Sequence, residues 1–323
     1  AMSQKSSEMK AQGIDVINMS VGEPDFMTPD HVKEAGKKAI DDNFSKYSPV
    51  PGYPVLREAI VKKLKQENHL DYAVSEIVVG TGGKQGVCNA ILALVNPGDE
   101  VIIPAPYWVS YPQMVKLAGG IPVIVSAGIE QDFKITAEQL EHAITPKTKM
   151  IILCSPSNPT GSVYSAEELE SLAKVVLAHD DLFVLSDEIY EHINYIGGHC
   201  SIASCQGMKD RTILCNGVSK AYAMTGWRLG WIAAPEWIAK GINKLQGQYT
   251  SGTCSVSQMA AVAAYEADQA CVADYREAFR RRRDLIVRLA KEIPGLEVNV
   301  PQGAFYLFPK CSSYFGKTDG KHV

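Results

Sequence analysis

The chain has 323 residues, of which 46% are apolar and 21% charged; these are the proportions of an ordinary globular protein, and they exclude a fibrous repeat or a long disordered tail. At roughly 150 residues per domain, this length predicts about two domains. The 36 acidic and 32 basic side chains give a formal net charge of −4, which argues against nonspecific nucleic-acid binding, because such binding needs a basic surface.

The sequence predicts neither a membrane anchor nor an export signal. No apolar run approaches the roughly 18–20 residues needed to cross a bilayer. The first stretch, AMSQKSSEMKAQG, lacks the apolar core of a secretory signal. The cysteines are scattered and form no C-x-x-C pair, which excludes a zinc ribbon and a thioredoxin motif. We therefore expect a cytoplasmic protein with reduced thiols and no membrane partner.

Apolar, β-branched runs alternate with amphipathic stretches through the first two thirds of the chain. The runs that predict strands are 76–80, 100–105, 121–126, 149–155, 182–187 and 211–217. Between them, 84–95 and 165–179 read as helices, the second beginning with a capping box at Ser165 and Glu168. This alternation predicts an α/β fold with a mostly parallel sheet flanked by helices. The runs are apolar at nearly every position, as strands covered on both faces require.

The pattern changes after residue 250. A long helical pattern covers roughly 256–292, and two short strands are predicted at 296–300 and 304–308. These elements predict the beginning of a second, smaller α+β domain.

Two motifs carry less information than they first suggest. The glycine turn at 80–85 follows a strand and precedes a helix, but it matches neither a Walker A loop nor a dinucleotide fingerprint. An anion site on backbone N–H groups and a plain tight turn both remain open for it. Glu188, His192, His199, Cys200 and Cys205 match no zinc spacing, so we expect solvated side chains and no metal site.

Polar residues of different types follow the late strands, where ligands bind in parallel sheets. Asn158, Asp187 and Tyr190 come after two of these strands, and Lys220 and Arg228 come after the next. Pyridoxal 5'-phosphate (PLP) needs such a set. Its aldehyde needs a lysine amine, its ring nitrogen a carboxylate, its phenolic oxygen donors, and its phosphate an arginine or a helix N-terminus.

The chain at this point resembles the class I aminotransferases of PLP fold type I, and within them the bacterial aspartate aminotransferase branch. The stretches that carry the resemblance are VGEPDF (21–26), KYSPVPGYPVLREAI (46–60), GTGGKQ (80–85), PAPYWVSYPQM (104–114), SPSNPTG (155–161), SDEIYEH (186–192), NGVSKAYAMTGWRLGW (216–231) and QGAFY (302–306). They follow the family order and span almost the whole chain.

The resemblance implies catalytic roles for three residues. Lys220 would carry PLP as a Schiff base and then shuttle the proton at the substrate Cα. Asp187 would pair with the ring nitrogen and remain ionised beside that cation. Tyr190, together with Asn158, would hydrogen-bond the phenolic oxygen of the cofactor.

It also implies how the rest of the cofactor and the substrate are held. The phosphate would be bound by Arg228, Ser219 and the turn at Gly83–Lys84, and Trp108 would stack on the ring. Tyr47 would reach the phosphate of a neighbouring subunit, so the resemblance implies a homodimer. The substrate would be lined by Gly22, Lys84, Trp108 and Asn158.

The activity implied is transamination between L-aspartate and 2-oxoglutarate by a ping-pong mechanism. Lys84 would face the distal carboxylate of the substrate, although capping the phosphate alone remains an alternative role for it. Other acceptors or donors, namely prephenate, aromatic amino acids or alanine, stay open, as does a C–S β-lyase. A PLP-sensing regulatory domain without turnover is a further alternative, and a Rossmann oxidoreductase is disfavoured by the failed glycine fingerprint.

The resemblance also implies a division of the chain. Residues 1–30 would belong to a small domain, 31–268 would form the large PLP-binding domain, and 269–323 would return to the small domain, which is incomplete in this chain. The family extends some tens of residues further at both ends, and its arginine for the substrate α-carboxylate lies beyond residue 323. We therefore expect these residues to be part of a longer polypeptide.

Overall fold

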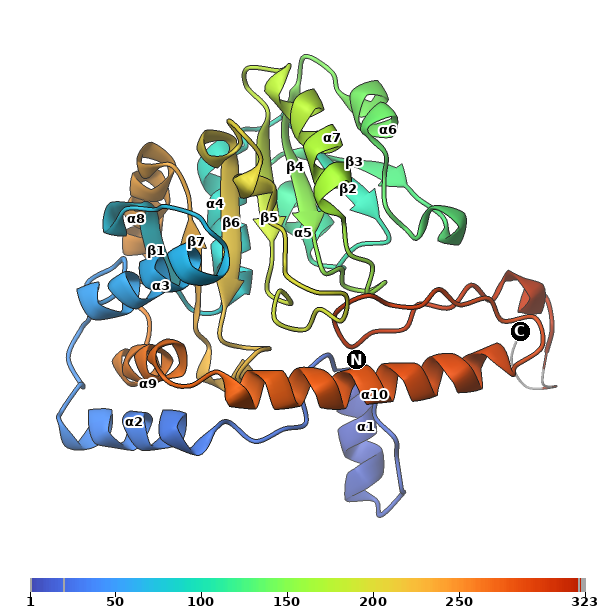
Figure 1. The fold of residues 1–323 in the computed structure, drawn as a ribbon, viewed down its shortest axis with the longest axis horizontal. Helices are drawn as coiled ribbons and strands as arrows, with labels where there is room; N and C mark the ends of the chain where they lie inside the picture. Colours follow the sequence, from blue (N-terminus) through green and yellow to red (C-terminus); the bar gives the residue numbers. More distant parts are fainter. Residues whose placement is uncertain (1, 20, 319, 321–323) are drawn as a thin grey trace.

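The structure is a computed structural model that describes residues 2–19, 21–318 and 320. Its centre is a seven-stranded sheet with the strand order β1-β7-β6-β5-β4-β2-β3 (Figure 1). The strands are β1 (Ile77–Gly80), β2 (Glu100–Ala105), β3 (Ile121–Ser126), β4 (Thr148–Cys154), β5 (Phe183–Asp187), β6 (Thr212–Gly217) and β7 (Gly230–Ala233).

The sheet is mostly parallel, which confirms the predicted fold class. Strands β3, β2, β4, β5 and β6 are parallel neighbours, whereas β7 runs antiparallel between β6 and β1. The sequence analysis did not predict β7. Because β7 is antiparallel, it begins at the edge where the other strands end.

Helices cover both faces of the sheet. The helices are α1 (Met2–Ala11), α2 (Asp30–Asp41), α3 (Pro54–Glu67), α4 (Gly83–Leu94), α5 (Tyr111–Leu117), α6 (Ala137–Ala143), α7 (Ala166–Leu177), α8 (Glu236–Tyr249), α9 (Ser255–Glu266) and α10 (Ala270–Lys291). On one face, α4, α5 and α8 pack against alternate strand residues such as Ile213 and Cys215. The opposite face is covered by α3, α9, α6 and α7.

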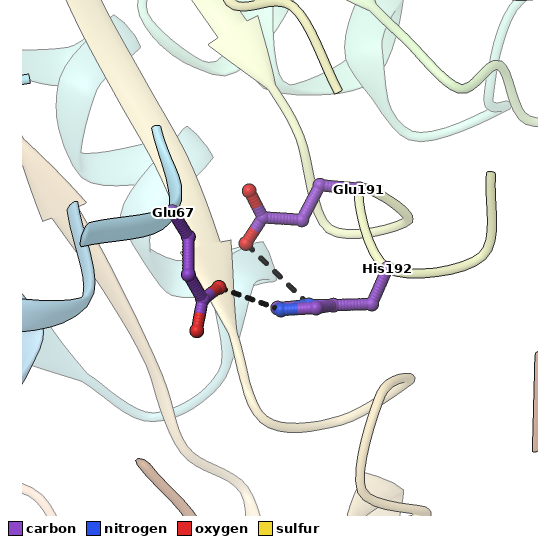
Figure 2. A group of neighbouring side chains, drawn as sticks. All are labelled: Glu67, Glu191 and His192. Carbon is purple, nitrogen blue, oxygen red and sulfur yellow. Dashed lines mark hydrogen bonds and ion pairs between the residues drawn. The ribbon is translucent and has the colours of Figure 1, made fainter. Parts of the chain in front are cut away.

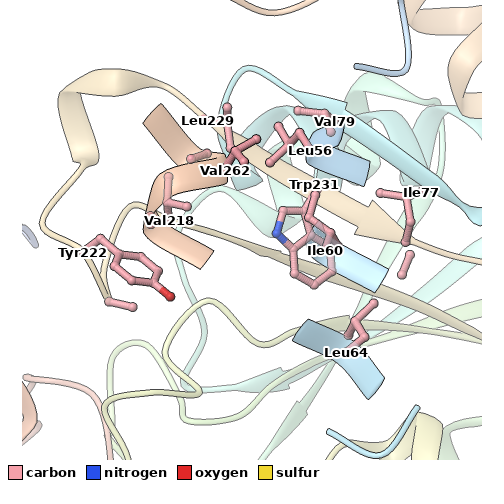
Figure 3. Close-up of a cluster of buried hydrophobic side chains, with 14 of the residues drawn as sticks. Leu56, Ile60, Leu64, Ile77, Val79, Val218, Tyr222, Leu229, Trp231 and Val262 are labelled. Carbon is pink, nitrogen blue, oxygen red and sulfur yellow. The ribbon is translucent and has the colours of Figure 1, made fainter. Parts of the chain in front are cut away.

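The burial alternates along single strands, which explains why the strand runs are apolar throughout. In β6, Ile213 packs in one core and Leu214 in the other, and both are fully buried. Figure 3 shows the core beneath α3 and α9, where the Trp231 ring of β7 lies among side chains of α3, including Leu56 and Ile60. The Trp231 indole Nε1–H donates to Tyr265 Oη at 2.7 Å, so its polar atom is satisfied inside the core.

One strand prediction needs correction. We expected every strand to be covered on both faces, but β3, one of the two edge strands, is partly exposed: Ile121 retains 47% and Ile124 42% of its accessible surface. The other edge strand, β1, is buried throughout because α3, α4 and α8 pack against it, so the cover provided by helices, and not edge position alone, decides the exposure.

The predictions for the last third were partly wrong. The helical pattern at 256–292 is two helices, because Ala267 is extended and the Asp268 carboxylate accepts a hydrogen bond from the Ala270 N–H. The predicted strands at 296–300 and 304–308 are absent from the described residues of that region. Only single bridges form there, Asn194 with Gly303 and Glu297 with Lys310. In Figure 1, this segment lies beside α10, below the sheet.

The thiols and the helix lengths agree with the simpler expectations. All eight cysteines are free, and no disulfide joins them. Within residues 2–19, 21–318 and 320, no helix has both the length and the apolar character that crossing a bilayer demands. The capping box at Ser165 and Glu168 is present at the beginning of α7, as predicted.

Candidate active site

A cavity of about 500 Å³ opens at the edge of the sheet where the parallel strands end. Asp187 is the last residue of β5 and Cys154 the last residue of β4, and the two are register partners. Lys220 follows the end of β6 by three residues, and Arg228 precedes β7 by two. Neighbouring strand ends therefore bring together side chains that are far apart in the sequence.

One corner of the cavity is built to hold an anion. Gly82, in the left-handed region with φ +82°, precedes α4, whose first turn presents unpaired backbone N–H groups. Arg228 closes this corner, and its guanidinium donates to the carbonyls of Thr225 at 2.8 Å and Thr81 at 3.4 Å. We call Gly82, Gly83 and Arg228 the anion corner.

Close backbone approach at the anion corner requires glycine. A Cβ atom added to Gly82 would lie 2.5 Å from Arg228 Nη2. A Cβ atom added to Gly230 would lie 2.2 Å from the backbone nitrogen of Gly83. Any larger residue would displace the guanidinium or the first turn of α4, so the corner fits a phosphate bound by backbone N–H groups and one arginine.

Lys220 lies in a mostly apolar part of the cavity. Its amine donates to the backbone carbonyl of Gly22 and lies 5.6 Å from the ring centroids of Tyr190 and Phe305. Burial lowers the pKa of Lys220 to about 8, although the carboxylates of Glu23 and Asp187 favour the charged form. The amine is therefore far closer to its neutral, nucleophilic form at neutral pH than an exposed lysine.

Asp187 is fixed by two donors. The hydroxyl of Tyr111 donates to Asp187 Oδ2 at 2.7 Å, and the Ile189 N–H donates to Oδ1 at 3.4 Å. Burial raises the pKa of Asp187, while these hydrogen bonds and the charge of Lys220 lower it. A cation placed in the cavity against this carboxylate would favour its ionised form.

Two of the tyrosines that line the cavity contact each other. The hydroxyl oxygens of Tyr190 and Tyr306 lie 2.6 Å apart, so one donates to the other. Burial raises the pKa of Tyr190 well above its usual value and that of Tyr306 to about 12, so both stay protonated at neutral pH. They can donate a hydrogen bond to an oxygen anion held near Lys220.

Lys84 and Trp108 form the remaining polar and aromatic side. The Lys84 amine lies 4.9 Å from the centroid of the Trp108 ring. The Trp108 ring in turn packs edge-on against Tyr111 at 5.3 Å. Lys84 therefore offers a positive charge next to a flat apolar surface.

Most of the site residues predicted from the sequence line this cavity, and Tyr47 lies outside it. Gly22, Gly83, Lys84, Trp108, Asn158, Asp187, Tyr190, Ser219, Lys220 and Arg228 all line the cavity. Tyr47 does not. Its side chain is 99% exposed and lines a separate surface hollow with residues such as Ser48 and Thr253.

The sequence analysis missed several residues that also line the cavity, among them Glu23, Tyr111, Cys154 and Tyr306. Tyr111 lies three residues after Trp108 on the first turn of α5, and its partner Asp187 is 76 residues away. Tyr306 lies within a quoted family stretch, QGAFY, which was the available signal. For Glu23, the signal was the similar stretch VGEPDF.

The expectation of solvated side chains after β5 was wrong for two residues. Glu188 is 1% exposed, and the His199 side chain retains only 7% of its surface. They pair with each other, with His199 Nε2 and Glu188 Oε2 at 2.7 Å. Burial would lower the pKa of His199, but the charge of Glu188 raises it overall.

Known proteins resemble this chain in sequence over most of its length. The family model described as aminotransferase class I and II matches residues 14–319. An aspartate/prephenate aminotransferase of Cereibacter sphaeroides is 50% identical over 320 residues, covering 98% of this chain and 80% of that protein.

Solved structures resemble it in fold as well. An aspartate aminotransferase from Rhizobium meliloti superposes with a TM-score of 0.95 at 44% identity, covering 100% of this chain and 81% of that one. An aspartate aminotransferase from Thermus thermophilus, solved with maleate, gives a TM-score of 0.94 at 42% identity, covering 98% of this chain and 82% of that one.

Proposed function

Because the chain belongs to the class I and II aminotransferase family, we propose that it transfers the amino group of L-aspartate to 2-oxoglutarate, forming oxaloacetate and L-glutamate by a ping-pong mechanism with PLP. The observation that carries this proposal is the cavity in which Lys220, with its lowered pKa, faces Asp187 and the anion corner. PLP requires a lysine for its aldehyde, a carboxylate for its ring nitrogen and an anion site for its phosphate.

The residues present fit the cofactor. The phosphate would bind at Arg228, Ser219, Gly83 and Lys84, and the ring would lie against Trp108 with its nitrogen toward Asp187. Tyr190 and Asn158 would donate to the phenolic oxygen. When bound, PLP supplies an electron sink that accepts the electron pair left at the substrate Cα.

The chain's own residues would hold the cofactor and move the proton at the substrate Cα. The Lys220 amine would hold the cofactor through its aldehyde, and as a base it would take the proton from the substrate Cα. Asp187 would keep the ring nitrogen protonated by its negative charge, and the Tyr111 hydroxyl orients that carboxylate. The ring centroids of Tyr190 and Phe305 lie 5.6 Å from the Lys220 amine, so these rings make its surroundings less polar.

The preference for a dicarboxylate rests on Lys84. Its amine is the cation beside the Trp108 ring and would pair with a carboxylate distal to the reacting carbon. Maleate, bound in the Thermus thermophilus relative, is itself a four-carbon dicarboxylate. The backbone of Gly22 would line the substrate on the other side.

Prephenate is a second candidate acceptor. Relatives that share about half of their residues with this chain carry prephenate in their names. A second hollow of about 690 Å³ adjoins the site and is lined by Trp108, Phe305 and Phe308, among others. These rings offer apolar surface for a bulkier substrate beyond the distal carboxylate.

We propose further that the enzyme is a homodimer in the cytoplasm, with Tyr47 of each subunit reaching the phosphate of the other. The exposed Tyr47 ring supports this, because its hollow contains Thr253, whose hydroxyl lies 3.2 Å from that of Thr81 beside the anion corner. Light scattering tests the dimer. The variant Tyr47→Phe tests the contact between the subunits, and we expect it to bind PLP more weakly than the parent.

The predicted division into 1–30 and 269–323 against 31–268 also stands as a proposal. It is supported by the contacts of the early segment with α10. The Phe26 ring stacks on Tyr275 at 4.3 Å, and Asp25 pairs with Arg282 at 2.7 Å. Limited proteolysis tests it, with cuts expected near residues 30 and 268.

The function is tested by a two-substrate assay. Purified protein with PLP is given L-aspartate and 2-oxoglutarate, and oxaloacetate is measured; the same protein is given prephenate as acceptor, and cystathionine as a lyase substrate. We expect oxaloacetate with 2-oxoglutarate and no pyruvate from cystathionine. Pyruvate release without amino transfer would replace the proposed activity with C–S lysis.

A further inference from the structure

Behind the cavity lies a buried ionic network that the proposed mechanism does not use. Its centre is Lys63 of α3, whose side chain is only 2% exposed and which pairs with the carboxylate of Glu191, itself 4% exposed. Lys63 also donates to Asn68 Oδ1 at 2.6 Å and lies 3.5 Å from Glu67. Buried lysines are rare, and a lysine in such a position needs partners for its charge, as Lys63 has here.

Two histidines extend the network toward the surface. Figure 2 shows His192 between Glu67 and Glu191: its Nε2 lies 2.9 Å from Glu67 Oε2, and its Nδ1 lies 3.5 Å from Glu191 Oε1. His199 pairs with Glu188 on the other side. The carboxylates and histidines have the spacing of metal ligands, but the Lys63 ammonium already lies among them. The cluster is therefore compensated by the protein's own charges.

The network reaches two strand ends that carry the catalytic groups. Glu191 is the fourth residue after Asp187, and its neighbour Tyr190 lines the cavity while Glu191 points away from it. Glu191 Oε1 accepts a hydrogen bond from Asn216 Nδ2 at 2.8 Å. Asn216 lies near the end of β6, four residues before Lys220, and its Oδ1 accepts from the Gly217 N–H at 2.7 Å.

We propose that the Lys63–Glu191 pair, acting through Asn216, is a positioning network that sets the distance between Asp187 at the end of β5 and Lys220 beyond β6. The inference rests on the proposed function, because it concerns the two groups that would grip opposite ends of PLP. None of its members touches the cavity. Burial raises the pKa of Glu191, but the charge of the paired Lys63 outweighs this and holds that pKa below its usual value.

Two asparagines on the same carboxylate provide a matched pair of variants. Asn216 donates to Glu191 Oε1, and Asn68 donates to Glu191 Oε2, both at 2.8 Å and both from buried positions. Asn68 caps the end of α3, and within the part of the chain that the structure describes its side-chain hydrogen bonds go to Lys63 and Glu191 and not to β6. Replacing either by alanine removes one amide from Glu191, but only Asn216→Ala breaks the connection to the Lys220 turn.

The test is made on the holoenzyme with three readouts: thermal stability, kcat, and the pH midpoint of the near-visible absorbance of bound cofactor. Asn216→Ala should lower kcat about tenfold and move the midpoint by about one pH unit, because small displacements of reacting groups are costly. Asn68→Ala and Asn216→Ala should lower the melting temperature by similar amounts. In Asn68→Ala, however, kcat should stay within about twofold of the parent. Equal effects of both variants on kcat and midpoint would overturn the proposal.

A further variant covers the case in which Asn216→Ala does not fold. Asn216→Asp keeps the side-chain volume and the acceptor for Gly217 but places a second carboxyl against Glu191. We expect it to approach parent kcat at low pH, where the two carboxyls share a proton, and to lose activity as pH rises. An Asn216→Asp enzyme with the parent's pH profile, or failure of both Asn216 variants to fold, would assign this amide to folding alone. If the parent itself shows no cofactor band, it is the proposed function that fails.

Discussion

The two walls of the cavity are built differently. The sheet-edge wall, which carries Asp187, Lys220 and Arg228, stands at strand ends backed by two cores and by the Lys63 network. The loop wall, residues 21–23 and 304–306, contains no helix or strand. It is held by single contacts, such as the hydrogen bond from the Ala304 N–H to the Ile193 carbonyl at 2.7 Å.

This difference matches two kinds of task. Chemistry common to all amino-acid substrates requires groups fixed within fractions of an ångström, which strand ends provide. Substrates of different size require a wall that can adjust, and a wall of loops can do so at little cost. Changes on the sheet-edge wall should therefore alter reaction steps, and changes on the loop wall should alter substrate binding and preference.

The largest effect is expected at Lys220. Lys220→Ala removes both the cofactor's covalent attachment and the base, so amino transfer from aspartate should fall by about 10⁴-fold. Lys62→Ala, which changes an exposed lysine of α3, is the matched control and should keep the parent rate. The steady-state rate of oxaloacetate formation measures both. A Lys220→Ala enzyme that retains a tenth of the activity would contradict the role of the sheet-edge wall in the reaction steps.

The next effect is expected at Tyr111, which holds the buried Asp187. Tyr111→Phe leaves Asp187 Oδ2 without its donor, and a lost hydrogen bond to a charged group costs about 1.5–3 kcal/mol. We expect kcat to fall by about tenfold or more, with KM for aspartate little changed. Steady-state kinetics against aspartate give both constants. A rise in KM alone would show that Tyr111 acts in binding, contrary to its hydrogen bond with Asp187 of the sheet-edge wall.

A smaller effect with the opposite signature is expected on the loop wall. Tyr306→Phe removes the 2.6 Å contact with Tyr190, a neutral hydrogen bond that typically contributes about 1 kcal/mol. We expect kcat/KM to fall roughly fivefold, mainly through KM. Tyr314→Phe, a partly exposed tyrosine outside the cavity, is the control. An effect confined to kcat would contradict the claim that the loop wall acts in substrate binding.

The smallest effect concerns pH. Burial lowers the pKa of Lys220 to about 8, so its neutral fraction should rise only about twofold between pH 8 and pH 10, against roughly 70-fold for an exposed lysine. The rate at which cofactor-free protein takes up PLP measures this. The unfolded chain binds more protons between pH 8 and its ordinary lysine pKa, so this group adds stability as pH rises through that window. A rate that keeps climbing beyond pH 10 would contradict the burial of this amine.

The sequence predicted the sheet-edge wall better than the loop wall, for a physical reason. Asp187 and Lys220 follow apolar strand runs, and parallel strands end at one edge, so a local pattern is enough to bring them together. Tyr111 was missed because its role depends on a partner 76 residues away. The pairing of Tyr306 with Tyr190 likewise depends on how a loop folds back, which no local period encodes.

The same limit explains two errors and one open prediction. Glu188 and His199 were expected to be solvated, because nothing in their spacing indicates that they bury each other. The strands predicted at 296–300 and 304–308 form only isolated bridges, because strand formation depends on a neighbour and not on apolar content alone. Tyr47 depends on a second chain, so its role in a neighbouring subunit stays a prediction.

The most direct test of the central claim is reduction of the PLP-loaded protein with borohydride followed by peptide mass analysis. The account predicts one equivalent of cofactor mass, carried by the peptide that contains Lys220 and by no other. Cofactor mass on Lys84 or on another lysine, or none at all in a protein that transfers amino groups, would contradict it.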